Sequence, residues 1–208
     1  MSAHLIKGKN FDKPTNYLLN RLAAYSSNYW FGFISDPATA LFCLFWDALV
    51  LRSSAYSIVA FFVLGLFAWS LLEYGFHRWV YHKGRTIAHA GHLMHHESPR
   101  ALIGMPWFMS TGFLWGFWYV FAHRLQVHGS LSFIAGLDTG FMLYSLLHHI
   151  HHHSSASKSR FRKLRAHHNI HHRLPHVNFG VTTRLWDRVF GTHHVKGKMK
   201  TVSKPVTN

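Results

Sequence analysis

The sequence predicts an all-α integral membrane protein: a four-helix domain built from two helical hairpins, with a helical, histidine-rich cap on the cytoplasmic side. Three observations predict this class: four apolar segments, a one-sided distribution of basic residues, and clustered histidines outside the apolar segments. The 208 residues suit one domain. The single cysteine, Cys43, excludes an intramolecular disulfide framework.

Short or basic links separate the apolar segments. Asp36 and Pro37 indicate a helix start, because Asp is a favoured N-cap and Pro suits the first helical position. A full span needs about 20 residues, so the first segment is either tilted at partial depth or begins upstream. The expected spans lie near residues 37–51, 55–72, 105–122 and 129–147.

Composition divides the chain into three parts. We expect residues 36–195 to form the membrane domain. Residues 1–35 are basic and aromatic, which favours either a helix at the cytoplasmic membrane surface or a short arm packed on the domain. Residues 196–208 are expected to be a disordered tail.

Basic residues fall almost entirely on one side of the expected spans. Of the 22 Lys and Arg residues, all but Arg52 and Arg124 lie in the two termini or the loop between the hairpins. The positive-inside rule therefore places both termini and the histidines in the cytoplasm, in a bacterial inner membrane or the endoplasmic reticulum. Because the charge flanks membrane spans, we expect anionic lipid headgroups rather than nucleic acid as its partner.

The spans also contain small and acidic residues. The pairs Gly112/Gly116 and Gly136/Gly140 predict close helix packing, or alternatively room for an apolar chain. Asp47 and Asp138 are costly in hydrocarbon and are candidate functional residues, although Asp138 is better explained by a hydrogen bond within the bundle.

The histidines follow four patterns: H-x4-H, H-x2-H-H, H-x3-H and H-x2-H-H. Residues three and four apart share one helix face, so each H-x2-H-H set can point at one spot. The H-x4-H pair fits an α-helix less well, since its members lie about 140° apart. The patterned residues are His77, His82, His92, His95, His96, His148, His152, His168, His171 and His172.

Imidazole is the commonest metal ligand in proteins. Ten histidines are too many for one tetrahedral zinc, and shared between two metals they give five nitrogens each. A six-coordinate metal would then keep one position open for oxygen or water. Imidazole suits iron, copper and zinc, and a redox role favours iron.

The segments HRWVYH, HLMHH, HHIHH and HHNIHH, with NFGVTTRLWDRVFGT near the C-terminus, resemble the histidine boxes and closing segment of the fatty acid hydroxylase/sterol desaturase superfamily. The resemblance covers about residues 73–192. It implies that the ten histidines bind a di-metal centre on the cytoplasmic side of a four-helix membrane domain. It also implies two iron ions as cofactors, with zinc as a substitute in a purified form, and dioxygen as oxidant.

The resemblance implies hydroxylation of a lipid, with an acyl chain of a fatty acid or ceramide as the first choice of substrate. A sterol or carotenoid substrate, and desaturation, are alternatives within the same chemistry. A non-catalytic metal-binding membrane protein, such as a transporter or store, is the alternative from another class. Spans nearly free of histidine count against a transporter.

Further residues are expected to support the metal ligands. Glu73 lies one helical turn before His77 and either orients it or marks the end of the span. Trp186 and Phe190 are expected to pack inward, and Asp187 to pair with Arg184 or Arg188. The expected supporting residues are Glu73, His89, Tyr144, His167 and Asp187.

An oxygenase also needs electrons, and this sequence contains neither a dinucleotide fingerprint nor the cysteines of an iron–sulfur cluster. We therefore expect a separate electron donor of the cytochrome or ferredoxin type. Its acidic surface would dock on the basic residues Arg160, Arg162, Lys163 and Arg165.

Overall fold

The computed structural model describes residues 25–84, 86–154 and 159–194, and these contain helices but no strands. Residues 1–24 of the expected arm and the whole expected tail, 196–208, lie outside the described residues, so the division into three parts stays a prediction. In chain order the helices are α2 (Ser26–Leu49), α3 (Ala55–Gly75), η1 (Phe76–Tyr81), α4 (Ile87–Glu97), α5 (Trp107–Phe117), η2 (Trp118–Arg124), α6 (Ser130–His153), α7 (Ser159–Arg173) and α8 (Leu185–Val189).

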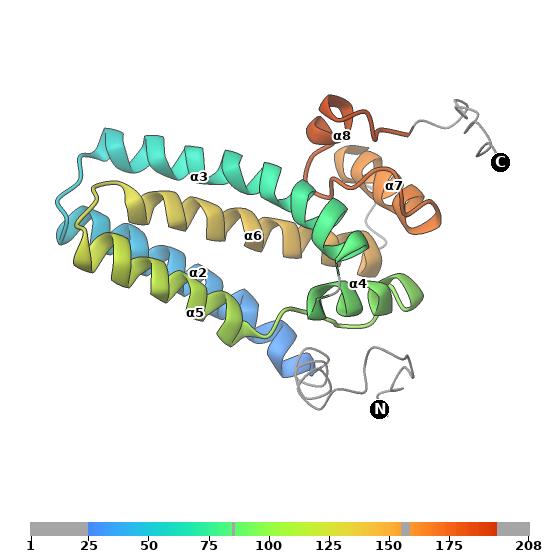
Figure 1. The fold of residues 1–208 in the computed structure, drawn as a ribbon, viewed down its shortest axis with the longest axis horizontal. Helices are drawn as coiled ribbons and strands as arrows, with labels where there is room; N and C mark the ends of the chain where they lie inside the picture. Colours follow the sequence, from blue (N-terminus) through green and yellow to red (C-terminus); the bar gives the residue numbers. More distant parts are fainter. Residues whose placement is uncertain (1–24, 85, 155–158, 195–208) are drawn as a thin grey trace, which may run out of the picture.

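The long helices α2, α3, α5 and α6 lie side by side as an elongated bundle, and α4, α7 and α8 gather at one end of it (Figure 1). Among the described helices, two are long and apolar enough to cross a membrane: Ala55–Tyr81, which joins α3 to η1, and Ser130–His153. The all-α prediction is confirmed. A membrane domain of four spans stays a prediction.

The expected helix start at Asp36 and Pro37 is wrong. Helix α2 begins at Ser26 and runs through Pro37, so the first helix does begin upstream. Proline inside a helix removes one backbone donor and crowds the preceding turn, and α2 nevertheless continues through it. Packing over a 24-residue helix outweighs the local signal.

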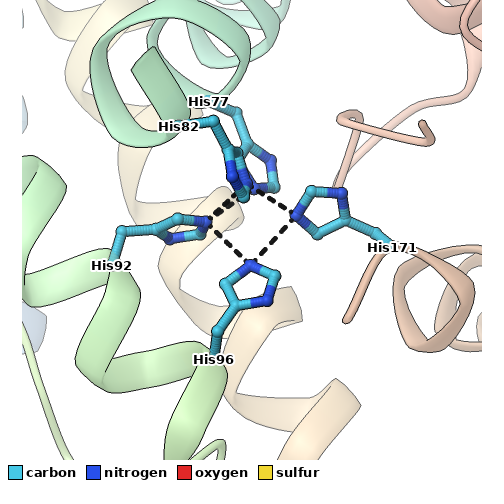
Figure 2. Close-up of side chains that lie close together, drawn as sticks. All are labelled: His77, His82, His92, His96 and His171. Atoms are coloured by element: carbon cyan, nitrogen blue, oxygen red, sulfur yellow. Dashed lines mark hydrogen bonds between the residues drawn. The ribbon is translucent and has the colours of Figure 1, made fainter. Parts of the chain in front are cut away.

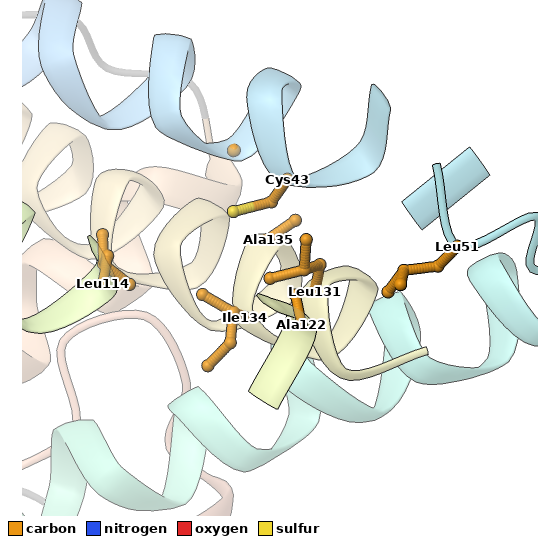
Figure 3. Packing of buried hydrophobic residues seen from close by; sticks show 8 residues of the cluster. Cys43, Leu51, Leu114, Ala122, Leu131, Ile134 and Ala135 are labelled. Atoms are coloured by element: carbon orange, nitrogen blue, oxygen red, sulfur yellow. The ribbon is translucent and has the colours of Figure 1, made fainter. Parts of the chain in front are cut away.

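Close packing of α3 on α6 depends on glycine. A Cβ added to Gly65 or Gly136 would collide with the backbone of the facing helix, and one added to Gly140 would lie 2.6 Å from Trp69. The predicted packing role is therefore correct for Gly136/Gly140. It is wrong for Gly112 and Gly116, which have open space around the Cβ position. Buried apolar side chains from α2, α5, η2 and α6 fill the rest of the bundle (Figure 3).

Asp47 has a structural role that explains its place in an apolar helix. Its carboxylate is fully buried and accepts hydrogen bonds from Ser53 Oγ at 2.5 Å, Gly129 N at 3.2 Å and Ser132 N at 2.9 Å. The first backbone N–H groups of a helix lack partners within the helix. Asp47 supplies a hydrogen-bond acceptor for the start of α6. This contact joins the two hairpins at the end of the bundle that lies away from the histidines.

Candidate metal centre

The ten patterned histidines converge at the end of the bundle in two groups of five. The first cluster contains His77, His82, His92, His96 and His171, and the second contains His95, His148, His152, His168 and His172. Within each cluster the nearest ring nitrogens all lie within 4.8 Å of one another. The structure thus brings together every patterned histidine, and their role as metal ligands remains a proposal.

A π-helix explains how His77 and His82 reach the same cluster. Residues five apart diverge on an α-helix, but η1 (Phe76–Tyr81) has the wider i→i+5 winding, which places them about one turn apart. Their rings lie with centroids 5.3 Å apart and nearly parallel. In this protein the H-x4-H pair therefore suits the π-helical turn that follows the apolar helix α3.

Each H-x2-H-H set is divided between the clusters, so the expectation that each points at one spot is wrong. His92 and His96 belong to the first cluster and His95 to the second. On α7, His168 and His172 belong to the second cluster and His171 to the first. Residues four apart stay on one side of a helix, while the third residue is rotated about 100° from its neighbour in sequence. Helices α4 and α7 therefore each contribute to both clusters.

Backbone carbonyls fix the orientation of two rings in the first cluster. His77 Nδ1 donates to the carbonyl oxygen of Phe179, and His171 Nδ1 donates to that of Val177 at 2.8 Å. A neutral imidazole has one donor and one acceptor nitrogen. The Nε2 atoms of both rings therefore carry lone pairs, and they point into the cluster.

The Nε2 atoms are spaced as metal ligands are. Four of them close a ring, with successive distances of 2.9 Å for His92–His82, 2.9 Å for His82–His171, 3.2 Å for His171–His96 and 3.0 Å for His96–His92 (Figure 2). For metal–nitrogen bonds of about 2.1 Å, neighbouring ligands at right angles lie about 3.0 Å apart. Lone pairs facing one another at this distance repel unless a cation lies between them, so the donor set fits a metal ion.

The second cluster has the same spacing. His95 Nε2 lies 2.9 Å from that of His148 and 3.1 Å from that of His172. His168 Nε2 lies 3.1 Å from that of His172 and 2.9 Å from that of His152. Two adjacent sites with five imidazole nitrogens each fit two metal ions of the imidazole-preferring group, iron, copper or zinc.

Electrostatics keep these histidines neutral. Burial, reinforced by neighbouring imidazoles, lowers the pKa of His171 and of His172 to about 3, and lowers the pKa of His92 well below its ordinary value. The pKa of the less buried His82 falls to about 4 for the same reasons. At neutral pH the rings are therefore unprotonated, which is the form that binds metal.

Residues 177–182, which we call the strap, hold the clusters from outside and were missed by the sequence patterns. The strap supplies the carbonyl oxygens of Val177 and Phe179 to the first cluster. Its Asn178 is fully buried with a positive φ of 57°, and its Nδ2 donates to the carbonyl oxygen of His167 at 3.3 Å. Backbone carbonyls leave no sequence signal, although Asn before Phe-Gly does suit a left-handed turn.

Two buried carboxylates anchor the strap. Asp187 accepts from Phe179 N and Gly180 N, each at 2.8 Å, and also from Thr192 Oγ1 and His167 Nε2. The expected pairing of Asp187 with Arg184 or Arg188 is wrong, because its side chain faces inward. Burial alone would raise the pKa of Asp187, but these hydrogen bonds, from His167 first, hold it below its ordinary value. Glu73 accepts from Val181 N at 2.6 Å and Thr182 N at 3.0 Å. It therefore holds the strap, and the strap in turn contacts His77 through the carbonyl oxygen of Phe179.

The other expected supporting residues lie next to the clusters. His89 Nδ1 donates to the carbonyl oxygen of Tyr81 at 2.5 Å, which ties the start of α4 to the end of η1. Tyr144 stacks on His148 with ring centroids 5.6 Å apart. His167 reaches the strap through Asp187. The patterns missed His151, which is buried and lies with Nε2 3.4 Å from the carbonyl oxygen of Val181.

A mostly apolar cavity of about 170 Å³ opens onto both clusters. His92 of the first cluster and His95 and His148 of the second form its inner wall, while Phe141 and Met109 are among its apolar lining. A smaller cavity of about 50 Å³ shares Phe141 and extends it along α2, α5 and α6. The cavity could therefore hold an apolar chain against the histidines.

Comparisons with known proteins agree with this architecture. Residues 62–192 match the family model described as fatty acid hydroxylase. The ceramide very long chain fatty acid hydroxylase scs7 of Schizosaccharomyces pombe is 31% identical over 164 residues, which cover 70% of this chain and 47% of that protein. A dihydroceramide fatty acyl 2-hydroxylase of Arabidopsis thaliana is 31% identical over 146 residues, covering 65% of this chain and 61% of that protein.

The fold is also similar to a solved structure. Full-length scs7p, of which only the hydroxylase domain is visible, matches with a TM-score of 0.71 and 25% identity over 86% of this chain and 71% of that one. The chain spans less than two thirds of the length of the first curated relatives that it matches.

Proposed function

The chain belongs to the fatty acid hydroxylase family, and from this membership we propose that it is a membrane-bound, O2-dependent hydroxylase of a lipid acyl chain with two irons in its histidine clusters. The observation that carries the proposal is the apolar cavity ending on two clusters of five histidines. Relatives named for fatty acyl and ceramide hydroxylation support an acyl group, free or in a ceramide, as substrate.

Hydroxylation of a C–H bond consumes one dioxygen, two electrons and two protons, and yields the alcohol and water. Iron bound in the clusters would supply the redox chemistry that cleaves dioxygen. The protein's own contribution is to position and to exclude water. An acyl chain bound in the apolar cavity would have a methylene group next to His95 and His148, with Phe141 and Tyr144 among the residues that enclose it.

Helix η1 and the strap hold the first cluster rigid. His77 is fixed on one side by its place in η1 and on the other by the carbonyl oxygen of Phe179. Partners behind metal-bound histidines orient the ring and raise its basicity, and losing them typically costs about 10–100-fold in metal affinity or activity. We therefore assign the strap to ligand positioning.

We propose that the bundle spans the membrane several times with the clusters on the cytoplasmic side. The charge distribution supports this, because Arg52 and Arg124 lie at the turn end of the bundle while the other basic residues lie in the histidine end or in the termini. Cysteine introduced at Lys83 should be labelled from the cytoplasm, and cysteine at Ser54 from the opposite side. Labelling of the Lys83 position from outside would contradict the topology.

We propose that the electrons come from a separate acidic carrier. Arg162 and Lys163 are exposed on α7, the helix that also contributes His168 and His172 to the second cluster. Arg165 instead donates to the carbonyl oxygen of Ser154 at 2.6 Å and is partly buried. The docking surface is therefore centred on Arg162 and Lys163, and the side chain of Arg160 lies outside the described residues.

The test combines metal analysis with lipid mass spectrometry. We expect about two irons per purified chain and a product that gains one oxygen atom. His171→Ala (first cluster) and His95→Ala (second cluster) should each lower the iron content and abolish the product. His123→Ala is the matched control, because this exposed histidine lies outside both clusters.

The other outcomes distinguish the alternatives. Loss of two hydrogens without gain of oxygen would indicate desaturation. Two metals per chain with no lipid product, in the presence of a reductant that serves other oxygenases, would indicate a metal-binding protein without catalysis. Equal metal content in all three variants would contradict the cluster assignment itself.

A further inference from the structure

Helix α8 lies against the C-terminal part of α3. Trp186 Nε1 donates to Ser70 Oγ at 3.0 Å, and the Trp186 ring lies 5.7 Å from that of Phe67. One turn further along, Phe190 stacks on Tyr74 with ring centroids 5.1 Å apart. Because α3 belongs to an apolar stretch long enough to cross a membrane, α8 lies at the level where the proposed span reaches the membrane surface.

The outer face of α8 is apolar. Leu185 is 44% exposed and Val189 is 59% exposed, and the neighbouring Phe67 on α3 is 54% exposed. A short helix with apolar side chains outward and basic side chains beside them is typical of a membrane interface. This face therefore continues the apolar surface of α3 to the headgroup region.

A basic cleft of about 490 Å³ lies beside this face, between α7 and α8. Its lining includes Lys163 from α7, Arg184 at the N-cap of α8 and Arg188 within α8, together with the hydroxyl-bearing Thr182 and Thr183. Within the described part of the chain these three cations form no ion pair. No acidic residue is among the described residues lining the cleft, and the carboxylate of the adjacent Asp187 is turned inward to the strap.

We propose that this cleft binds the phosphate group of an anionic membrane phospholipid. Guanidinium groups bind phosphate oxygens in a two-pronged geometry, and Arg184, at the N-cap of α8, lies four residues before Arg188. The adjoining apolar face decides between a lipid and a soluble anion, because acyl chains of a lipid held in the cleft would lie along Leu185 and Val189. The site is separate from the metal clusters and rests on the membrane placement proposed above.

Binding here would also stabilise the metal centre from a distance. Arg184 and Arg188 flank Asp187, whose carboxylate anchors the strap, and Thr182 is itself part of the strap. A lipid that holds α8 in place therefore holds the strap that orients His77 and His171.

The experiment uses the full chain in nanodiscs of neutral phosphatidylcholine, with and without phosphatidylglycerol. Native mass spectrometry after gentle detergent exchange should find phosphatidylglycerol retained on the wild type. The double variant Arg184→Gln/Arg188→Gln should retain it at least about tenfold less, because it removes both guanidinium groups that would contact the phosphate directly. The matched control Arg100→Gln/Arg162→Gln removes the same charge from exposed positions outside the cleft and should change retention by less than about twofold.

Each contrary outcome is distinct. Equal losses in the two double variants would mean that the basic face acts only by diffuse attraction, which overturns the site. Displacement of the retained lipid by millimolar inorganic phosphate, with equal thermal protection by phosphate alone, would assign the cleft to a soluble anion. Failure of the wild type to enter nanodiscs would instead contradict the membrane placement. Should the double variant not fold, the single exposed change Arg188→Gln makes the same comparison against Arg162→Gln.

Discussion

Replacing Asp187 with alanine is expected to release the strap and weaken both metal binding and stability. The carboxylate is fully buried and accepts four hydrogen bonds, from two backbone N–H groups, the hydroxyl of Thr192 and the ring of His167. Alanine leaves all four donors without this acceptor in a place where water cannot replace it.

The expected magnitude depends on the strength of these four hydrogen bonds. Each hydrogen bond to a charged group contributes about 1.5–3 kcal/mol, but the four share one carboxylate and do not add. A buried donor left without its acceptor costs about 1–3 kcal/mol, and for four donors that lose one shared acceptor we expect the unfolding free energy to fall by about 3–5 kcal/mol. For a chain of this size that decrease lowers the melting temperature by about 6–20 °C.

The assay is thermal unfolding of the purified protein in one detergent, with iron content measured on the same sample. Glu97→Ala is the matched control: Glu97 is an exposed acid at the end of α4, and an exposed substitution of this kind changes stability by about 0.5 kcal/mol or less. Asp187→Asn keeps the shape but removes the charge, and should fall between the two. A melting temperature within about 2 °C of the wild type, which corresponds to less than about 1 kcal/mol, with full iron content in Asp187→Ala, would refute the anchoring role.

Three further predictions concern helix packing, pH and salt. Gly136→Val should destabilise the protein by about 1–3 kcal/mol in chemical unfolding, because its Cβ would meet the carbonyl oxygen of Phe62. Gly116→Ala should not destabilise the protein, because there is open space around the Cβ position of Gly116. Equal effects of the two substitutions would contradict the close contact between α3 and α6. Burial lowers the pKa of His171 to about 3. Between about pH 6.5 and 3 the unfolded chain therefore binds a proton that the metal-free folded protein does not bind, so the stability of the metal-free protein should decline as the pH falls through this range. A melting temperature that stays constant between about pH 7 and 5 would contradict this. Turnover with an acidic protein carrier should fall as salt rises from about 50 to 300 mM, because salt screens charge attraction over about 8 Å. Charge reversal at Arg162 and Lys163 should lower turnover to the same extent at low salt. Turnover with a small neutral reductant should not change in either experiment.

The sequence by itself determined the helical class, the family and the identity of the ten clustered histidines. These depend on local spacing: apolar runs long enough for a membrane helix, and histidines three and four residues apart on one helix. Counting ligands also gave five per metal, which matches the two clusters in the structure. A spacing rule succeeds here because each pattern lies within one helix, whose periodicity is fixed by its hydrogen bonds.

Predictions from residue spacing failed where the helix changed its winding, and where the partners of a side chain lie far away in the sequence. The π-turn at η1 reverses the expected divergence of His77 and His82, and Pro37 lies inside a helix that it was expected to start. Asp47 was a functional candidate in the sequence, but its partners lie about 80 residues away at the start of α6. Neither its burial nor its partners can be derived from its own segment.

Only the tertiary structure decided which histidine belongs to which cluster. His95 and His96 are neighbours in sequence but belong to different clusters, because successive side chains of a helix point about 100° apart. Their partners on α7 come from 75 or more residues away. The strap, whose backbone carbonyls orient the rings, is set by Asp187 and Glu73 from two further helices. Composition and periodicity determine which side chains can bind a metal, but the packing of helices distant in sequence determines which of them meet.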